Sequence, residues 1–368
     1  MMETREYYLA LSLAGVFSPA TQHTLIAAAG SAAALFKAPD SFFHSRRGLR
    51  KASVEGFLRK RKTLALGKAI RGLEKRGISW VTLADPEYPE LLREIHDPPL
   101  TLYLKGSGRC WGEYPLAVVG TRRCSHYGRR AAEEIVGRLP SRVSVISGMA
   151  AGIDGVAHRA ALKKGVPTVA VLGTGVDIVY PSVNRPLYRE LLEEGTLVSE
   201  FPPGTGPQKH HFPQRNRIIS GLSRGVLVVE SSQKSGSLIT ASFALAQGRD
   251  VFAVPGSIFR QSCAGTNALI KEGAVPVTRG SDISDFWGLD GEEDPAGPVK
   301  RDSLTEDEKT VINHLDAEDP VSMEEIACAL EERLPMGRLS AALLSLKMKK
   351  YIMELDNRRF VLKDEDEL

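Results

Sequence analysis

Six short runs of β-branched and apolar residues constrain the fold of this 368-residue chain more than any other feature. The runs are LAVVG, VSVISG, TVAVLG, TLVSEF, GVLVVES and DVFAVPG, and helix-compatible stretches separate them. Continuous apolar runs without alternation are typical of parallel strands that are buried on both faces of a sheet. The middle of the chain therefore predicts an open α/β fold with a mainly parallel sheet.

Glycine-rich turns follow four of these runs: VGTRR, SGMAAGID, LGTGVD and ESSQKSGS. In open α/β sheets, ligands bind outside the carboxyl ends of the strands. Glycine lets backbone amides approach a ligand, and a helix that begins just after the turn adds a partial positive charge. The chain has neither GxGxxG nor GxxxxGK[ST], which disfavours a standard dinucleotide or P-loop site. The turns are suited to binding an anion.

Five basic residues lie in or beside these turns and in the stretch KHHFPQRNRIISG. We expect them to converge if the strands are ordered as in an open sheet. Taken singly, Arg122 is better explained as a surface residue beside Arg123, and Lys234 as a lysine that flanks a helix. For Arg217 we expect a structural ion pair with Glu200 or Glu230. The set is Arg122, Lys209, Arg215, Arg217 and Lys234.

Phe212 lies inside this basic stretch and follows Lys209, His210 and His211. A base that stacks on an aromatic ring gains about 1–3 kcal/mol without a demand for a particular base. A buried core phenylalanine is the alternative, but three polar neighbours favour exposure. Cations and a ring together predict a groove for single-stranded nucleic acid.

No catalytic, metal or cofactor site is expected from the sequence. Asp154 and His158 are four residues apart, which would suit an acid/base pair, but we favour a structural pair. The two adjacent histidines lack an HExxH context. The cysteines are far apart without a CxxC pair, which indicates buried thiols rather than zinc or disulfides: Cys110, Cys124, Cys263 and Cys328.

Two smaller domains are expected to flank a core of residues 76–288. Residues 1–75 alternate helical patterns with breaks, which indicates a small helical domain of the SAM-like or helix-hairpin-helix kind. Its basic runs RRGLRK and RKRK suit either DNA phosphates or a solvated face. Residues 289–302 combine glycine, proline and charge, as a linker does. Residues 303–368 form the second small domain.

The C-terminal segment predicts a winged helix. Thr305 with Glu308 and Ser322 with Glu325 form capping boxes at the starts of two helices. A third helix, about 338–350, carries an apolar stripe, and YIMELDNRRFVL then predicts a hairpin that turns at Asp356 and Asn357. The stripe consists of Leu339, Leu343, Leu344 and Leu346.

Charge distribution separates this tail from the rest of the chain. The whole chain carries a formal net charge of +3, yet residues 303–368 carry nine basic against sixteen acidic side chains, a net −7. This charge opposes contact with phosphates, so a protein-contact or regulatory role for the tail is at least as plausible as DNA reading. The longest nearly apolar run, 25–36, is too short to span a bilayer, and no signal peptide is recognisable, so we expect a cytoplasmic protein.

Seven longer segments resemble the DNA-processing protein A (DprA/Smf) family. They are VTLADPEYPELLREIHDPPLTLYLKG, AVVGTRRCSHYGRRAA, SGMAAGIDGVAHRAAL, TVAVLGTGVDIVYP, HHFPQRNRIISGLSRGVLVVES, KSGSLITASFALAQGRDVFAVPG and GTNALIKEGA. The resemblance implies an extended Rossmann-like core, often with a SAM-like domain before it and a winged helix after it. It also implies a non-catalytic protein that binds and protects single-stranded DNA and loads RecA onto it, above all in natural transformation.

The resemblance also assigns residues. Its DNA pocket falls on Arg122, Lys209 and Phe212, and the RNR and KSGS elements border that pocket. Homodimerisation is a family property, and its surface would lie near Leu269 and Ile270, although an apolar pair there suits a core equally well. The bordering residues are Arg215, Asn216, Arg217, Lys234, Ser235, Gly236 and Ser237.

Two other functions fit parts of the sequence. A Rossmann-like nucleotide-binding enzyme of the phosphoribohydrolase kind would carry PGGxGTxxE, with a glutamate at the helix start. This chain has KSGSLITA there, with a lysine before the helix and no acid within it. A DNA-reading winged-helix repressor is disfavoured by the acidic tail and by the larger size of the core.

Overall fold

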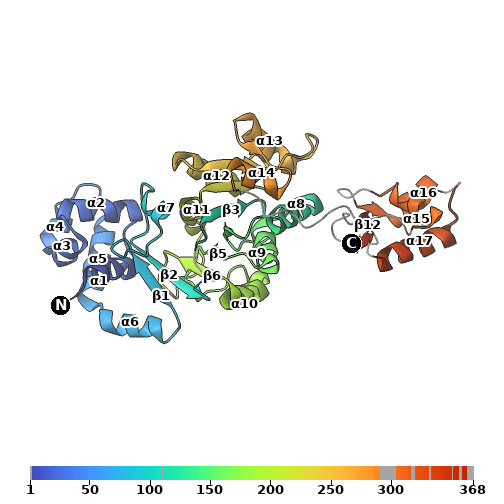
Figure 1. The fold of residues 1–368 in the computed structure, drawn as a ribbon. Helices are drawn as coiled ribbons and strands as arrows, with labels where there is room; N and C mark the ends of the chain where they lie inside the picture. The colour runs from blue at the N-terminus through green and yellow to red at the C-terminus, as the bar shows by residue number, and fades with distance from the viewer. Residues whose placement is uncertain are drawn as a thin grey trace. The chain divides into compact units, whose positions relative to one another are not determined.

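The computed structural model describes residues 2–108, 111–289, 304–315, 320–330, 333–349, 351–355 and 359–362. These residues form two compact units (Figure 1). One contains residues 1–124 and 131–288, and the other contains residues 125–130 and 289–368. Most of the predicted linker, residues 290–302, and the predicted hairpin turn at Asp356 and Asn357 lie outside the described residues.

The first unit begins with helices that pack around an aromatic and aliphatic core. Ser18 and Ser31 cap two of these helices, because each hydroxyl accepts a hydrogen bond from the backbone amide three residues later. The rings of Phe43 and Phe57 meet at 5.0 Å in the centre of this cluster. The helices are α1 (Thr4–Ala14), α2 (Pro19–Ala29), α3 (Ala32–Lys37), α4 (Asp40–His44), α5 (Lys51–Thr63) and α6 (Leu66–Glu74).

A nine-stranded sheet follows within the described residues, in the order β1-β2-β6-β5-β4-β3-β7-β8-β9. The seven strands β6, β5, β4, β3, β7, β8 and β9 run parallel to their neighbours. Strands β1 and β2 are added antiparallel at one edge. The strands are β1 (Ser79–Thr82), β2 (Thr101–Gly106), β3 (Tyr114–Val119), β4 (Val143–Ser147), β5 (Thr168–Val171), β6 (Thr196–Ser199), β7 (Gly225–Val228), β8 (Asp250–Ala253) and β9 (Val275–Pro276).

The six predicted strands correspond to β3 through β8, so the prediction of a mainly parallel α/β sheet is confirmed. Helix α1 packs against β1 and β2, and α9, α10 and α12 pack against parallel strands (Figure 1). The helices of this region are α7 (Glu90–Arg93), α8 (His126–Gly137), α9 (Ile153–Lys164), α10 (Arg185–Glu194), α11 (His211–Gly221), α12 (Gly236–Ala246), α13 (Ala264–Lys271) and α14 (Gly280–Phe286), with 3₁₀ turns at Ser182–Asn184 and Gln261–Cys263.

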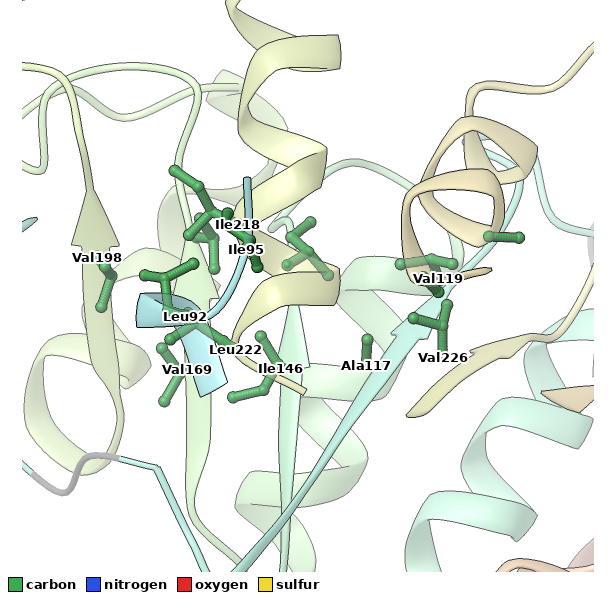
Figure 2. Packing of buried hydrophobic residues seen from close by; sticks show 14 of the residues in the cluster. Leu92, Ile95, Ala117, Val119, Ile146, Val169, Val198, Ile218, Leu222 and Val226 are labelled. Carbon is green, nitrogen blue, oxygen red and sulfur yellow. The ribbon is translucent and has the colours of Figure 1, made fainter. Parts of the chain in front are cut away.

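Both faces of the sheet are buried. Consecutive strand residues point to opposite faces, and in β5 Val169 and Ala170 enter two different apolar clusters. The cluster of Val169 also contains Ile218 of α11 and Leu222 directly after it (Figure 2), whereas the cluster of Ala170 contains Leu191 of α10. Burial on both sides explains why these strands have no polar alternation in the sequence.

The second unit contains α15 (Glu306–Ile312), β10 (Val321–Ser322), α16 (Met323–Leu330), α17 (Met336–Met348), β11 (Ile352–Leu355) and β12 (Arg359–Leu362). Its antiparallel strands are ordered β10-β12-β11. Both predicted capping boxes form. Of the predicted apolar stripe, Leu344 is an exception, because it is 60% exposed while the other three leucines are buried.

Candidate nucleic-acid interface

The carboxyl ends of five parallel strands lie along one edge of the sheet. Strands β5, β4, β3, β7 and β8 are consecutive neighbours, and all of them run in the same direction. The four glycine-rich turns follow β3, β4, β5 and β7, so they lie next to one another along this edge. We call it the carboxyl edge. It is the position at which open α/β sheets bind ligands.

Backbone contacts join three of these turns. The amide of Thr121, after β3, donates to the carbonyl of Glu230 after β7 at 2.8 Å. The amide of Ile153 donates to the carbonyl of Thr121 at 3.2 Å. Gly152 has φ +79°, and a Cβ at this position would collide with the Thr121 carbonyl, so only glycine allows the second turn to pack this closely on the first. The floor of the edge is therefore continuous.

Phe212 and Arg122 meet on this floor. Phe212 is in the first turn of α11 and is partly exposed. The guanidinium of Arg122, itself exposed, lies over its ring at 5.5 Å. The ring of Tyr180 contacts Phe212 at 5.4 Å between centroids, with the planes inclined by 36°. Gly173, after β5, lies against the ring edge, where a Cβ would be only 3.0 Å from a Phe212 ring carbon. The result is an aromatic surface with a cation beside it.

The start of α11 is anchored by His211. Its Nδ1 hydrogen-bonds the carbonyl of Gly173 at 3.1 Å, and its ring stacks on Phe201 at 4.0 Å. Burial lowers the pKa of His211. Lys209 and His210, immediately before it, are both exposed. Because His211 fixes the helix start against the turn after β5, Lys209 is presented beside the same edge.

The start of α12 brings another cation to the edge. Ser235 caps the helix, because its hydroxyl accepts from the amide of Ser237 at 3.4 Å. The Ser237 hydroxyl is buried and donates to the Ser231 hydroxyl at 3.0 Å. Lys234 precedes the cap and is exposed, as is Gly236. The positive end of this helix and the lysine both favour a negative charge here.

Asn216 connects the two helices. It is one turn after Phe212 on α11, so both side chains lie on the same face of that helix. Its Nδ2 donates to the carbonyl of Gly236 at 3.4 Å. The partly exposed face of α11 therefore leads from the aromatic surface to the start of α12.

Arg215 is buried, unlike the exposed cations Arg122, Lys209 and Lys234. The prediction that it contacts DNA directly therefore needs correction. Arg215 is 4% exposed, and its Nη1 donates to the carbonyls of Gly148, at 2.6 Å, and Val171. Burial lowers its pKa to about 10, although the nearby Asp154 carboxylate opposes this change. The guanidinium supports the carboxyl edge from beneath by holding the ends of β4 and β5.

Arg217 is also buried, at 3% exposure, so its inclusion among DNA contacts needs the same correction. The expected structural ion pair is present, since Nη2 lies 2.7 Å from Glu200. Its Nε also lies 3.0 Å from Asp97. The two arginines of RNR thus both face the interior, where Arg215 donates to backbone carbonyls and Arg217 pairs with carboxylates.

The proposed dimer surface at Leu269 also requires correction. Leu269 is 8% exposed and belongs to the large apolar cluster of the sheet, against which the partly buried Ile270 packs. The core alternative left open by the sequence is the correct one for Leu269.

Asp154 and His158 are buried, but they have separate partners. Asp154 Oδ2 accepts from the amides of Gly148 at 3.2 Å and Ala150 at 3.4 Å, and burial raises its pKa. His158 Nδ1 hydrogen-bonds the Thr168 hydroxyl at 2.8 Å, and burial lowers the pKa of His158 to about 3. Both residues have structural partners, as expected, but they do not form the expected pair with each other.

Tyr180 is the residue of this surface that sequence reasoning missed. It is 40% exposed. The signal was an aromatic side chain in the turn LGTGVDIVYP at the end of a predicted strand, where core packing does not require one.

Residues 79–288 match the model of the DNA recombination-mediator protein A family, which covers more than half of the chain. The chain belongs to this family. Among curated members, the DNA processing protein DprA of Streptococcus pneumoniae is 46% identical over 202 residues, which are 55% of this chain and 72% of that protein. The matched residues contain all nine strands from β1 to β9, so the family match concerns the sheet and its carboxyl edge.

Two solved structures of DprA proteins match the fold. The X-ray structure of DprA from S. pneumoniae has a TM-score of 0.67 at 36% identity and covers 77% of this chain and 98% of that one. A structure that describes the single-stranded DNA binding mode of DprA from Helicobacter pylori has a TM-score of 0.52 at 27% identity, with coverages of 58% and 97%. In this DprA family member, no helix among the described residues is long and apolar enough to span a membrane.

Proposed function

We propose that the carboxyl edge binds single-stranded DNA, with phosphates at Arg122, Lys209 and Lys234 and a base at Phe212. The observation that carries this proposal is the contact of an exposed guanidinium with a partly exposed phenylalanine at a sheet edge where two more exposed cations lie. Cations attract the phosphate backbone irrespective of sequence. Aromatic rings and guanidinium planes accept the faces of unpaired bases.

Unpaired strands fit this surface better than duplex DNA. A base can stack on the outer side of the layer formed by Phe212, Tyr180 and Arg122 only if that base is free of its own stack. Among the bordering groups, the Gly236 amide at the start of α12 can donate to the DNA backbone, whereas the amides of Ser235 and Ser237 donate within the protein. Asn216 lies between the ring and these amides.

In this proposal, each domain has its own role. Residues 76–288 hold the DNA, residues 1–75 form the SAM-like domain, and residues 303–368 form a winged helix that contacts protein rather than DNA because of its net charge of −7. A homodimer would present two edges to one strand, and the partly buried Ile270 remains the candidate for its surface. Loading of RecA onto the bound strand, as the family resemblance implies, completes the proposed role in DNA uptake, and no catalysis is required.

A titration with matched oligonucleotides tests this function. Fluorescently labelled oligothymidine and a duplex of the same length are titrated with the full chain at several salt concentrations. We expect tighter binding to the single strand and an affinity that falls with salt. Incubation with nucleotides should give no hydrolysis. Equal affinity for the duplex, or turnover of a nucleotide, would favour the nucleotide-enzyme or duplex-reading alternatives instead.

A further inference from the structure

Two large apolar side chains are exposed side by side after β8. Phe259 is 91% exposed and Ile258 is 83% exposed, the highest values among the large apolar side chains of the described residues. Adjacent exposed apolar residues of this size are a feature of interaction sites more than of ordinary surface. Neither residue belongs to the surface around Phe212.

The loop that carries them is held in place by its own hydrogen bonds. Two hydrogen bonds join Gly256 and Asn267. The Gly256 amide donates to Asn267 Oδ1 at 3.2 Å, and Asn267 Nδ2 donates to the Gly256 carbonyl at 2.9 Å. The Phe259 amide donates to the Ser257 hydroxyl at 3.3 Å, and the Arg260 amide donates to the Ser257 carbonyl at 3.1 Å. Phe259 therefore projects from a defined turn, which reduces the ordering cost of binding a partner.

This loop is a continuation of the carboxyl edge. It follows β8, which is the parallel neighbour of β7. At the start of α13, the amide of Gly265 donates to the carbonyl of Ser231 at 2.7 Å. Ser231 begins the turn that carries the exposed Lys234. The order along the edge is thus Phe212, Arg122, Lys234 and then Phe259.

Strand spacing gives the length of this path. Phe212 lies against the turn after β5, and Phe259 follows β8, so four inter-strand steps separate them. At about 4.8 Å for each step, the separation is about 19 Å. At about 3.4 Å for each nucleotide of a stacked strand, this distance corresponds to at most about six nucleotides, and an extended, unstacked strand spans it with fewer. A single strand that stacks on Phe212 reaches Phe259 after passing the cations.

We propose that Phe259 is a second stacking platform, which receives a base of the same single strand that Phe212 holds. This proposal rests on the proposed function. Continuity with the cationic edge selects a polynucleotide as the occupant, because a strand drawn to Lys234 continues directly onto the loop after β8. A ring at each end of a row of cations binds a strand of any sequence and fixes its minimum length.

Affinity for short and long oligothymidine tests the proposal. Phe259→Ala should weaken binding of dT12 by about 5- to 100-fold, and it should leave binding of dT3 unchanged, because three nucleotides are too short to reach both rings. Phe259→Trp should retain dT12 affinity, and its added fluorescence should be quenched by dT12. Phe259→Leu should lose affinity as Phe259→Ala does, because leucine keeps the apolar surface without the stacking ring.

Leu245→Ala is the matched control. Leu245 is 62% exposed in the last turn of α12, at the opposite end of that helix from Lys234, and its replacement should affect neither oligonucleotide. Unchanged dT12 affinity in Phe259→Ala, together with weakened binding in Phe212→Ala, would overturn this inference and leave the proposed function intact. Unchanged binding in both variants would overturn both. Loss of self-association in Phe259→Ala, measured by sedimentation without DNA, would assign the ring to a second copy and also overturn the inference.

Discussion

The guanidinium carbon of Arg122 lies 5.5 Å from the centre of the Phe212 ring, although the two residues are ninety positions apart in the sequence. One comes from the turn after β3 and the other from the start of α11. A cation over a ring face contributes about 0.5–1 kcal/mol at exposed sites. The contact therefore orders both groups, and it brings the two components of a single-strand site together.

Replacement of Phe212 separates stacking from charge. Phe212→Ala should reduce single-strand affinity by about 1–3 kcal/mol, while the dependence of affinity on salt should hardly change because no cation is lost. Fluorescence anisotropy at several salt concentrations measures both quantities. Phe212→Tyr keeps the ring and is the control that should bind normally. An unaltered affinity in Phe212→Ala would mean that the ring serves only the fold.

Tyr180→Ala should have a smaller effect than Phe212→Ala. Tyr180 packs on Phe212 at 5.4 Å, and such aromatic pairs contribute about 0.5–1.5 kcal/mol. We expect a loss of single-strand affinity of that order, since Phe212 is then less well positioned, and the same titration measures it. Tyr180→Phe, which keeps the ring pair, should behave like the parent chain. A loss in Tyr180→Phe as large as in Tyr180→Ala would point instead to a contact made by the hydroxyl.

Arg217→Ala should destabilise the fold. Its removal leaves the carboxylate of Glu200, itself buried, without its cation. Removal of one partner from a buried pair costs about 3–5 kcal/mol, which urea unfolding followed by circular dichroism would detect. Arg122→Ala, at an exposed position, is the control and should lose at most about 1 kcal/mol, the value of its contact with Phe212. Equal stability of Arg217→Ala and the parent would contradict the structural role given to RNR.

His158 should make the fold sensitive to acid. Its pKa is about 3 in the folded chain, against an ordinary value of 6.5, because the ring is fully buried. Below pH 6.5, His158 binds a proton in the unfolded chain but stays neutral in the native chain. The free energy of unfolding should therefore fall as the pH drops from 6.5 towards 3, by up to about 1.4 kcal/mol for each pH unit. Above pH 6.5 this contribution is complete.

His158→Asn isolates the effect of this one residue. The asparagine amide keeps a donor for the Thr168 hydroxyl but does not titrate. Urea unfolding of both chains between pH 7.5 and 5 should show a shallower pH dependence for the variant. Parallel curves would mean that other groups, such as His211, whose pKa burial also lowers, set the acid response.

The sequence predicted which strands and turns form this site better than it predicted which side chains are buried. Continuous apolar runs identified β3 to β8, because burial on both faces removes alternation. It missed β1 and β2, where SWVT and TLYLKG form antiparallel edge strands outside the pattern of runs and turns. Arg122 and Lys234 are exposed in the turns after β3 and β7, and Lys209 is exposed just before α11, whose start is anchored to the turn after β5.

Arg215 shows why the rest could not be predicted. Its partners are carbonyls of Gly148 and Val171, 67 and 44 positions away in the chain. A basic residue on a helix is ordinarily exposed, and no local pattern reveals that α11 packs on the sheet beside α12. The sequence left Leu269 undecided between an interface and the core for the same reason, because only the packing of α13 on β8 decides that its side chain enters the core.

The salt dependence of single-strand binding tests the central claim most directly. Affinity for oligothymidine is measured at several salt concentrations in the parent chain, in Arg122→Ala, in Lys209→Ala and in the control Lys164→Ala, whose exposed lysine ends α9 away from the carboxyl edge. Each of the first two variants should bind more weakly and flatten the slope of log K against log salt by about 0.7, whereas the control should not. Slopes that stay the same in Arg122→Ala and Lys209→Ala would contradict the assignment of DNA to this edge.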